Sequence, residues 1–156
     1  MMTGNFCLPI TQSTIGILAR CSTLRRLKIV TDPADFAVLE TLTTALCAGM
    51  PLTHLEVWVQ GVLRHTANVL ESALYRAACK WLVAPQRSLV VLKLEASKPL
   101  DVQLDKVLGV VDAVAERARV GQPCKHVCLL LRTGSRAAAI NTHATRMGVG
   151  DVVHAE

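Results

Sequence analysis

The stretch LRRLKIV, residues 24–30, decides the fold. Three later stretches repeat its Leu-x-x-Leu-x-Leu spacing: LTHLEVW from residue 52, LVVLKL from residue 89 and the degenerate copy CKHVCLLL from residue 124. Within each stretch apolar residues alternate with polar or mixed ones, which is the period of a strand buried on one face. The sequence therefore predicts four similar strands.

Helical periodicity follows each of these stretches. The predicted helices run from Asp32-Pro33 to Gly49, over residues 64–83, from Pro99 to Gly121 and over residues 135–147, and a short helix over residues 11–21 precedes the first strand. An acid followed by Pro is typical of a helix start, and Gly is typical of a helix end. Strands joined by single helices need crossover connections and so run parallel. We therefore expect one α/β domain over residues 1–156, with parallel strands alternating with helices.

The repeated stretches, each preceded by a helix end and a short loop, resemble the ribonuclease-inhibitor-like class of leucine-rich-repeat proteins. The segment CSTLRRL, residues 21–27, is the most similar, and the resemblance covers about residues 11–132. It implies a short arc with strands on the concave face and helices behind. The family's Asn beyond the last Leu of the motif is replaced here by Asp32, Gln60, Ser97 and Arg132, so we expect a degenerate arc.

The competing fold is a compact doubly wound α/β domain with helices on both faces of the sheet. The ending GVGDVVH, residues 148–154, loosely resembles the close of an anti-sigma-antagonist-type domain and fits that alternative. Strand order separates the two, because an arc keeps the order of the chain and a doubly wound sheet does not. In the arc, residues 133–156 would be a C-terminal cap, and residues 1–22 an N-terminal cap or a targeting segment.

Composition limits the function classes. The chain has 156 residues, of which 51% are hydrophobic and 3% aromatic, and this excludes a disordered chain. The apolar excess indicates a surface that a partner covers, or a chain that is a segment of something larger. We expect no secretory signal and no membrane span, because no apolar run is long enough. The six cysteines should then be reduced in an intracellular protein.

The distribution of charged residues along the chain indicates what kind of partner and which subcellular location to expect. The net charge is +5, and residues 1–31 hold Arg20, Arg25, Arg26 and Lys28 but no acid. Bases are not spread over one face among aromatic residues, so we expect no nucleic-acid binding. An acid-free opening rich in Ser, Thr and Arg is typical of mitochondrial transit peptides, and the alternative is an ordinary first helix and strand. We expect a mitochondrial or a cytoplasmic location.

Strand alternation predicts which side chains share the open face of the sheet. They form three rows: Arg26, His54, Val91 and His126; Lys28, Glu56, Lys93 and Cys128; and Val30, Trp58, Glu95 and Leu130. The predicted partner-binding residues are Arg26, Lys28, His54, Glu56, Trp58, Lys93 and Glu95. Trp58, an aromatic residue among charges, is the expected hot spot. The alternative for Trp58 is that helices of the same chain cover it.

One short stretch of the sequence has the residue types of a metal site. Cys124, His126 and Cys128 would point to one side of a strand, but the two sulfurs would lie too far apart to share one zinc ion, so a packed thiol pair is expected. The charged residues of the third predicted long helix indicate a solvated outer face: Asp101, Asp105, Lys106, Asp112, Glu116, Arg117 and Arg119. No nucleophile elbow and no glycine-rich phosphate loop is present, and we expect no cofactor and no metal.

We therefore expect a non-catalytic protein-binding or structural subunit of a larger intracellular assembly, such as a mitochondrial complex. The alternative is a small α/β ligand-binding or enzymatic domain with its site at the carboxyl ends of the strands. Its candidate residues are Asp32, Gln60, Ser97, Thr133 and Ser135.

Overall fold

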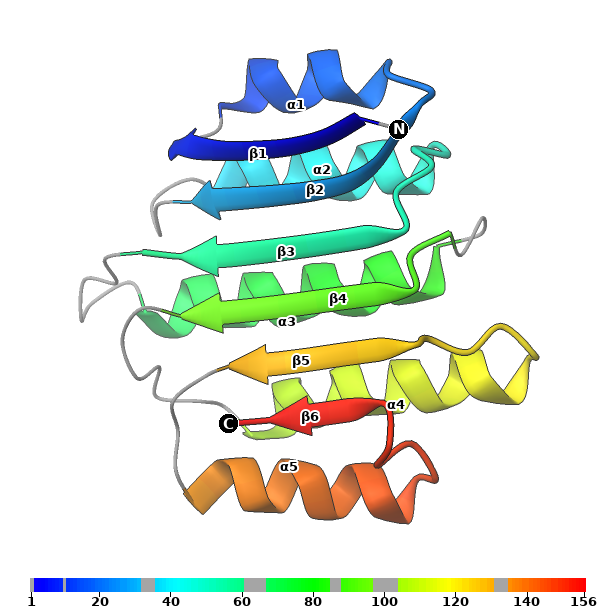
Figure 1. Ribbon diagram of the computed structural model, residues 1–156. Helices are drawn as coiled ribbons and strands as arrows, with labels where there is room; N and C mark the ends of the chain where they lie inside the picture. The colour runs from blue at the N-terminus through cyan, green and yellow to red at the C-terminus, as the bar shows by residue number, and fades with distance from the viewer. Residues whose placement is uncertain are drawn as a thin grey trace.

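The computed structural model describes residues 2–9, 11–31, 36–60, 67–84, 88–96, 104–130 and 135–156. In these ranges strands and helices alternate: β1 (Met2–Pro9), α1 (Gln12–Ala19), β2 (Leu24–Thr31), α2 (Phe36–Cys47), β3 (His54–Val59), α3 (Ala67–Val83), β4 (Val91–Ala96), α4 (Leu104–Arg119), β5 (His126–Leu130), α5 (Ser135–Arg146) and β6 (Val153–Ala155). The strands form one six-stranded parallel sheet (Figure 1). The predicted α/β class, with parallel strands alternating with helices, is confirmed.

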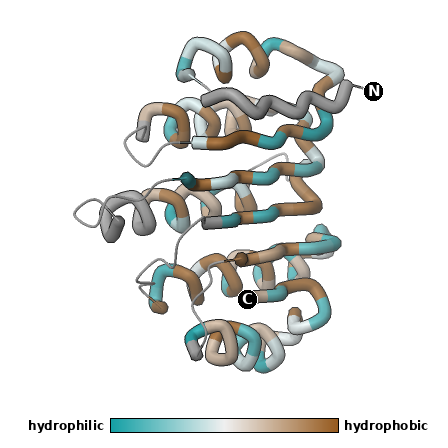
Figure 2. The backbone as a smooth tube through the Cα atoms, turned by 60° about the vertical axis from the view of Figure 1, so that its left-hand side comes forward, coloured by the Kyte–Doolittle hydropathy of each residue, from teal (hydrophilic) through white to brown (hydrophobic). Residues whose placement is uncertain are grey.

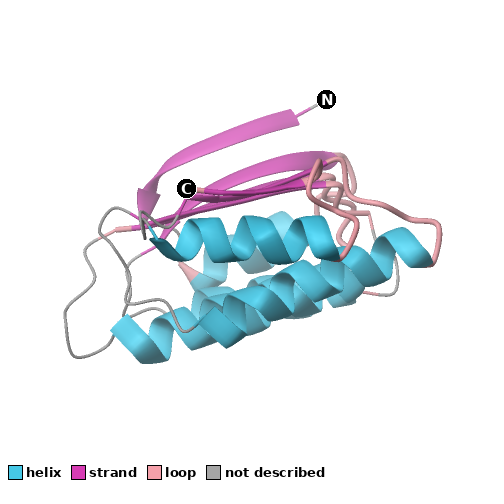
Figure 3. Ribbon diagram, turned by 90° about the horizontal axis from the view of Figure 1, so that it is seen from below, coloured by secondary structure: helices cyan, strands magenta, loops and turns pink. Residues whose placement is uncertain are grey.

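The molecule has two layers, a sheet and a row of helices. Figure 3 shows the helices on one side of the sheet. Strand order in the sheet is the order of the chain, β1 to β6, so the described strands contain no reversal of order. A doubly wound sheet needs such a reversal and helices on both faces. That alternative is therefore wrong, while the relationship to leucine-rich-repeat proteins stays a prediction.

The core lies between the two layers and is built from alternate strand residues. Leu27, Leu55, Leu92, Val127 and Val153 stand in one row across neighbouring strands, and all five are buried. A second buried row contains Ile29, Val57, Leu94, Leu129 and Ala155. Figure 2 shows hydrophobic and hydrophilic positions alternating along the strands. The repeated Leu-x-x-Leu-x-Leu stretches thus supply the sheet side of the core.

Local signals set the helix boundaries. Helix α1 begins after Thr11, whose Oγ1 accepts a hydrogen bond from the Thr14 N–H at 3.3 Å. Helix α2 is followed by Gly49, whose φ of 107° is a conformation that residues with a Cβ avoid. The predicted start of α2 at Asp32-Pro33 lies outside the described residues. Neighbouring helices are also joined by side chains: Trp81 Nε1 in α3 donates to Thr43 Oγ1 in α2 at 2.8 Å.

Helix α4 differs from its prediction. The expected apolar stripe included Leu104, Leu108 and Ala118, but the first two are half-buried and Ala118 is exposed. The buried face is rotated about the helix axis relative to the predicted stripe. It consists of Val107, Val110, Val111, Ala113, Val114 and Arg117. The predicted stripe also included Leu100, and the predicted outer face also included Asp101. Both residues lie outside the described ones.

Arg117 was predicted on a solvated face, and that prediction is wrong, because only 1% of the residue is exposed. Its Nε donates to the Gln122 carbonyl at 3.0 Å, and its Nη1 donates to the Leu89 carbonyl. Buried carbonyl groups need donors, and the guanidinium group has several. Arg117 thereby links the end of α4 to the segment that leads into β4.

The two outermost strands, β1 and β6, were not predicted. β1 pairs with β2 and β6 pairs with β5, so the predicted end segments 1–22 and 133–156 each add a strand and a helix to the two layers. Figure 1 places β1 and α1 at one end of the sheet and β6 and α5 at the other. None of the described helices is long and apolar enough to cross a membrane.

Candidate functional site

The open face of the sheet, opposite the helices, carries the three predicted rows of side chains. The register aligns Arg26 with His54, Lys28 with Glu56 and Val30 with Trp58. It continues to Val91, Lys93 and Glu95 on β4 and to His126, Cys128 and Leu130 on β5. β6 extends the middle row, because Cys128 is aligned with His154. All seven predicted partner-binding residues therefore lie on this open face.

Opposite charges in the middle row pair in two ways. Lys28 Nζ lies 3.5 Å from Glu56 Oε2 on the next strand, as cross-strand alternation predicts. Lys93 Nζ instead pairs with Glu95 Oε2 of its own strand, at 3.2 Å. The hydrogen bond with Glu95 raises the pKa of Lys93, and the charges of Glu95 and Glu56 add to this against the effect of burial. Each lysine of the middle row thus lies next to an acid, Lys28 next to Glu56 of the same row and Lys93 next to Glu95 of the neighbouring row.

His54 has a defined hydrogen-bond role. Its Nδ1 lies 2.8 Å from Thr53 Oγ1, and that hydroxyl donates its one proton to the Arg25 carbonyl at 3.0 Å. Nδ1 must therefore donate, which leaves Nε2 as the acceptor nitrogen of the neutral ring. Burial lowers the pKa of His54, and the positive charges of Arg26 and Lys125 lower it further, against the opposing effect of Glu56. The neutral ring offers an acceptor on the open face.

Trp58 lies near the middle of the open face, between Val30 on β2 and Glu95 on β4. The helices do not cover it, because they lie on the other side of the sheet (Figure 3). Its side chain is half-buried, yet its Nε1 is buried and has no hydrogen-bond partner among the residues that the structure describes. A buried donor without an acceptor costs about 1–3 kcal/mol. The sequence placed Trp58 on this face but held no sign of the missing acceptor.

The cysteines near β5 do not form the predicted thiol pair. Cys124 is buried in the core before β5 begins, whereas Cys128 is half-buried on the open face and His126 is exposed. Burial raises the pKa of both thiols. The expectation of a packed pair is wrong, because these two side chains lie on opposite faces of the sheet. No group of three potential metal ligands occurs among the described residues.

The competing site at the carboxyl ends of the strands lies largely outside the described residues, which exclude Asp32, Ser97 and Thr133. Gln60 is exposed, and its backbone N–H donates to the Thr31 carbonyl at 3.1 Å. Ser135 is the first residue of α5.

A groove of about 380 Å³ lies between α2 and α3, in the helix layer, and the sequence did not predict it. Glu40, Arg76 and Lys80 contribute charged groups to its lining. The hydroxyls of Thr43 and Thr44 also line it, but they donate to the Leu39 and Glu40 carbonyls of their own helix at 2.7 and 3.0 Å. The groove thus offers only exposed charges to a ligand.

Comparison with known proteins adds no relative: no family model, no curated protein and no solved structure matches the chain. The open face therefore has to be interpreted from its geometry and chemistry.

Proposed function

We propose that this chain is a non-catalytic protein-binding or structural subunit, which docks a protein partner on the open face of its sheet. The observation that carries the proposal is Trp58, a half-buried aromatic residue near the middle of that face whose buried N–H lacks an acceptor in the described part of the chain. Tryptophan is enriched among residues that dominate binding energies. A partner that supplies a carbonyl or carboxylate oxygen would satisfy the indole N–H when it binds.

The surroundings of Trp58 have the composition of an interface. Val30 stands next to Trp58 in the same row and is half-buried, so the two side chains form a short apolar strip over β2 and β3, while Glu95 separates Trp58 from Leu130. The pairs Lys28–Glu56 and Lys93–Glu95 lie beside this strip. An apolar centre next to polar groups is the usual plan of protein interfaces. The paired charges favour a partner of mixed charge, whereas nucleic acid requires an excess of bases.

The wider assignment rests on the repeat. A sequential parallel sheet backed by helices on one side supports the proposed relationship to leucine-rich-repeat proteins. We place the chain in an intracellular assembly, and the acid-free residues 1–31 favour a mitochondrial complex. A fluorescent protein fused to the C-terminus of the full chain should then localise to mitochondria, and a diffuse cytoplasmic signal would contradict this part of the proposal.

The docking proposal is tested by capturing partners from the native source on the tagged full chain and identifying them by mass spectrometry. Trp58→Ala should abolish a specific capture, and Trp58→Phe should weaken it because the ring remains but the N–H is lost. Lys80→Ala is the matched control, because Lys80 is exposed in the helix layer and its loss should change nothing. Capture that survives Trp58→Ala would contradict docking at this face.

Thermal unfolding of the free variants separates binding from folding. Trp58→Phe removes a buried donor that has no acceptor, so the free protein should be at least as stable as the wild type. Weaker capture without lower stability is the expected combination. A loss of stability that parallels the loss of capture would instead identify Trp58 as a purely structural residue.

A further inference from the structure

The end of the molecule at β1 and α1 has an unusual composition. Residues 1–19 contain no Asp, Glu, Lys, Arg or His, although the whole chain has 17 bases, 12 acids and 5 histidines. Helices and strands at the surface normally carry charges. Charges are also a device by which proteins stop an edge strand from pairing with other chains. This end therefore lacks the protection against association that charges give.

The backbone of β1 is an open edge. β1 pairs with β2 on one side, and no described strand pairs with its other side. A parallel strand with one free side offers unpaired N–H and C=O groups to another extended segment. At eight residues, β1 is long enough to form a ladder with such a segment.

Helix α1 exposes an apolar side chain at the same end. Ile17 is 71% exposed, more than any other large hydrophobic residue in the described part of the chain. The neighbouring Gly16 leaves open space, because a Cβ built there would meet nothing within 4 Å. Ser13, one turn before Ile17, is also exposed and uncharged. The exposed side of α1 is therefore apolar and uncharged, and it can pack against another uncharged surface.

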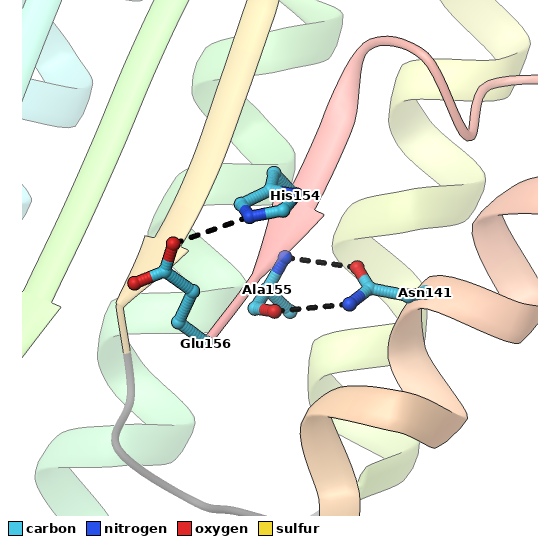
Figure 4. A network of polar contacts seen from close by, with 4 residues as sticks. All are labelled: Asn141, His154, Ala155 and Glu156. Atoms are coloured by element: carbon cyan, nitrogen blue, oxygen red, sulfur yellow. Dashed lines mark hydrogen bonds and ion pairs between the residues drawn. The ribbon is translucent and has the colours of Figure 1, made fainter.

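The opposite end of the sheet restricts how copies of the chain can meet. Asn141 in α5 donates from Nδ2 to the Ala155 carbonyl at 3.0 Å, and its Oδ1 accepts from the Ala155 N–H at 2.9 Å (Figure 4). The side-chain amide thereby occupies both backbone groups of Ala155 on β6. Head-to-tail stacking of β1 on β6 would have to displace this amide. Pairing of β1 with β1 meets no such obstacle.

We propose that a second copy of this chain is the partner of the β1 edge, related by a two-fold axis. The two β1 strands then run antiparallel, and each Ile17 is buried at or beside the contact. Charge favours this occupant: copies with a net charge of +5 repel one another, and residues 1–19 bring no charged side chain to a contact at this end. The dimer does not depend on the proposed function, and it leaves both open faces free for partners.

The test is the mass of the full chain in solution, measured by sedimentation equilibrium over a range of concentrations. The wild type should be a dimer that dissociates on dilution. Ile17→Lys and, separately, Ser13→Glu should each raise the dimer dissociation constant at least about tenfold, because a charge would enter the apolar contact. Both residues are exposed, so circular dichroism should show an unchanged fold.

Met147→Lys is the matched control, since Met147 is 42% exposed and follows α5 at the other end. This variant should associate like the wild type, and the association should be at least as strong at high salt as at low salt, because salt screens the repulsion between the positively charged copies. Hydrogen exchange of the β1 amides should be slower in the wild-type dimer than in the Ile17→Lys monomer. A wild type that stays monomeric at every concentration, or a dimer that only Met147→Lys disrupts, would overturn the proposal.

Discussion

Each end of the sheet consists of a strand and a helix, but the two edge strands differ in length and in what binds their backbone. At the β6 end the edge strand has only three residues, and Asn141 binds both the N–H and the C=O of Ala155. At the β1 end the edge strand has eight residues, and its register with β2 is shifted twice, between Met2 and Thr3 and between Asn5 and Pro9.

This difference teaches that one amide side chain is enough to close a parallel sheet. Asn has one donor group and one acceptor group in the geometry of a peptide, so it can replace the backbone of a further strand. His154 and Glu156 add a contact on the same end, with His154 Nε2 3.2 Å from Glu156 Oε1 (Figure 4). The β1 end has no described equivalent, and its residues 1–19 bring no charge to it.

The largest loss of stability is expected from a substitution that leaves a cavity in the core at the β1 end. Ile15 in α1 is completely buried, so Ile15→Ala should lower the free energy of unfolding by about 2–5 kcal/mol, measured by urea denaturation. Hydrogen exchange should accelerate in β1 and α1 first, since this end has no polar closure. Ile140→Ala is the control, because Ile140 is equally buried in α5. If Ile15→Ala and Ile140→Ala accelerated hydrogen exchange in β6 equally, the proposed difference between the two ends would be contradicted.

A smaller effect is expected from removing the closure of the β6 end. Asn141→Ala loses both hydrogen bonds to Ala155 and should cost about 1–3 kcal/mol in urea denaturation. It should also increase light scattering at high concentration, because a second edge becomes available. Asn141→Asp keeps the acceptor for the Ala155 N–H, so its free energy of unfolding should lie between that of the wild type and that of Asn141→Ala. Thr142→Ala is the control. If Asn141→Ala had the same stability and light scattering as Thr142→Ala, the amide of Asn141 would not close the edge.

The smallest effect concerns the middle of the sheet, which should respond to pH independently of the two ends. The pKa of His54 lies below the ordinary value of 6.5, so the unfolded chain takes up a proton more readily than the folded one. Stability should therefore be complete above pH 6.5 and fall on acidification until the pH is below the pKa of the folded state. His54→Gln should remove this part of the pH dependence of Tm, and an unchanged pH profile would refute it.

Much of the sheet could be predicted from the sequence, because its signal is local. The copies starting at Leu24, Leu52, Leu89 and Cys124 each carry the same alternation, and aligning them gives the rows that the register confirms. β1 and β6 escaped prediction because they lack the repeated spacing, and β6 has only three residues. Pairing with a neighbouring strand, rather than local preference, makes them strands.

The features that were missed depend on contacts between distant residues. Arg117 stands among charged residues in the sequence, and only the fold shows that its donors meet the carbonyls of Gln122 and Leu89. Asn141 likewise appears as one polar residue of a helix until β6 lies beside it. The unpartnered N–H of Trp58 is a property of its surroundings, and no sequence motif encodes it.

The order of the strands also has a consequence for how the protein is made. Each strand after β1 is synthesised when the strand it pairs with has already left the ribosome, so no segment has to wait for a later one. Short loops closed in succession keep the entropic cost of each step low, which favours rapid folding from the N-terminus onward. The growing sheet keeps a free leading edge throughout translation, and that edge is closed by a side chain only when Asn141 and β6 have emerged.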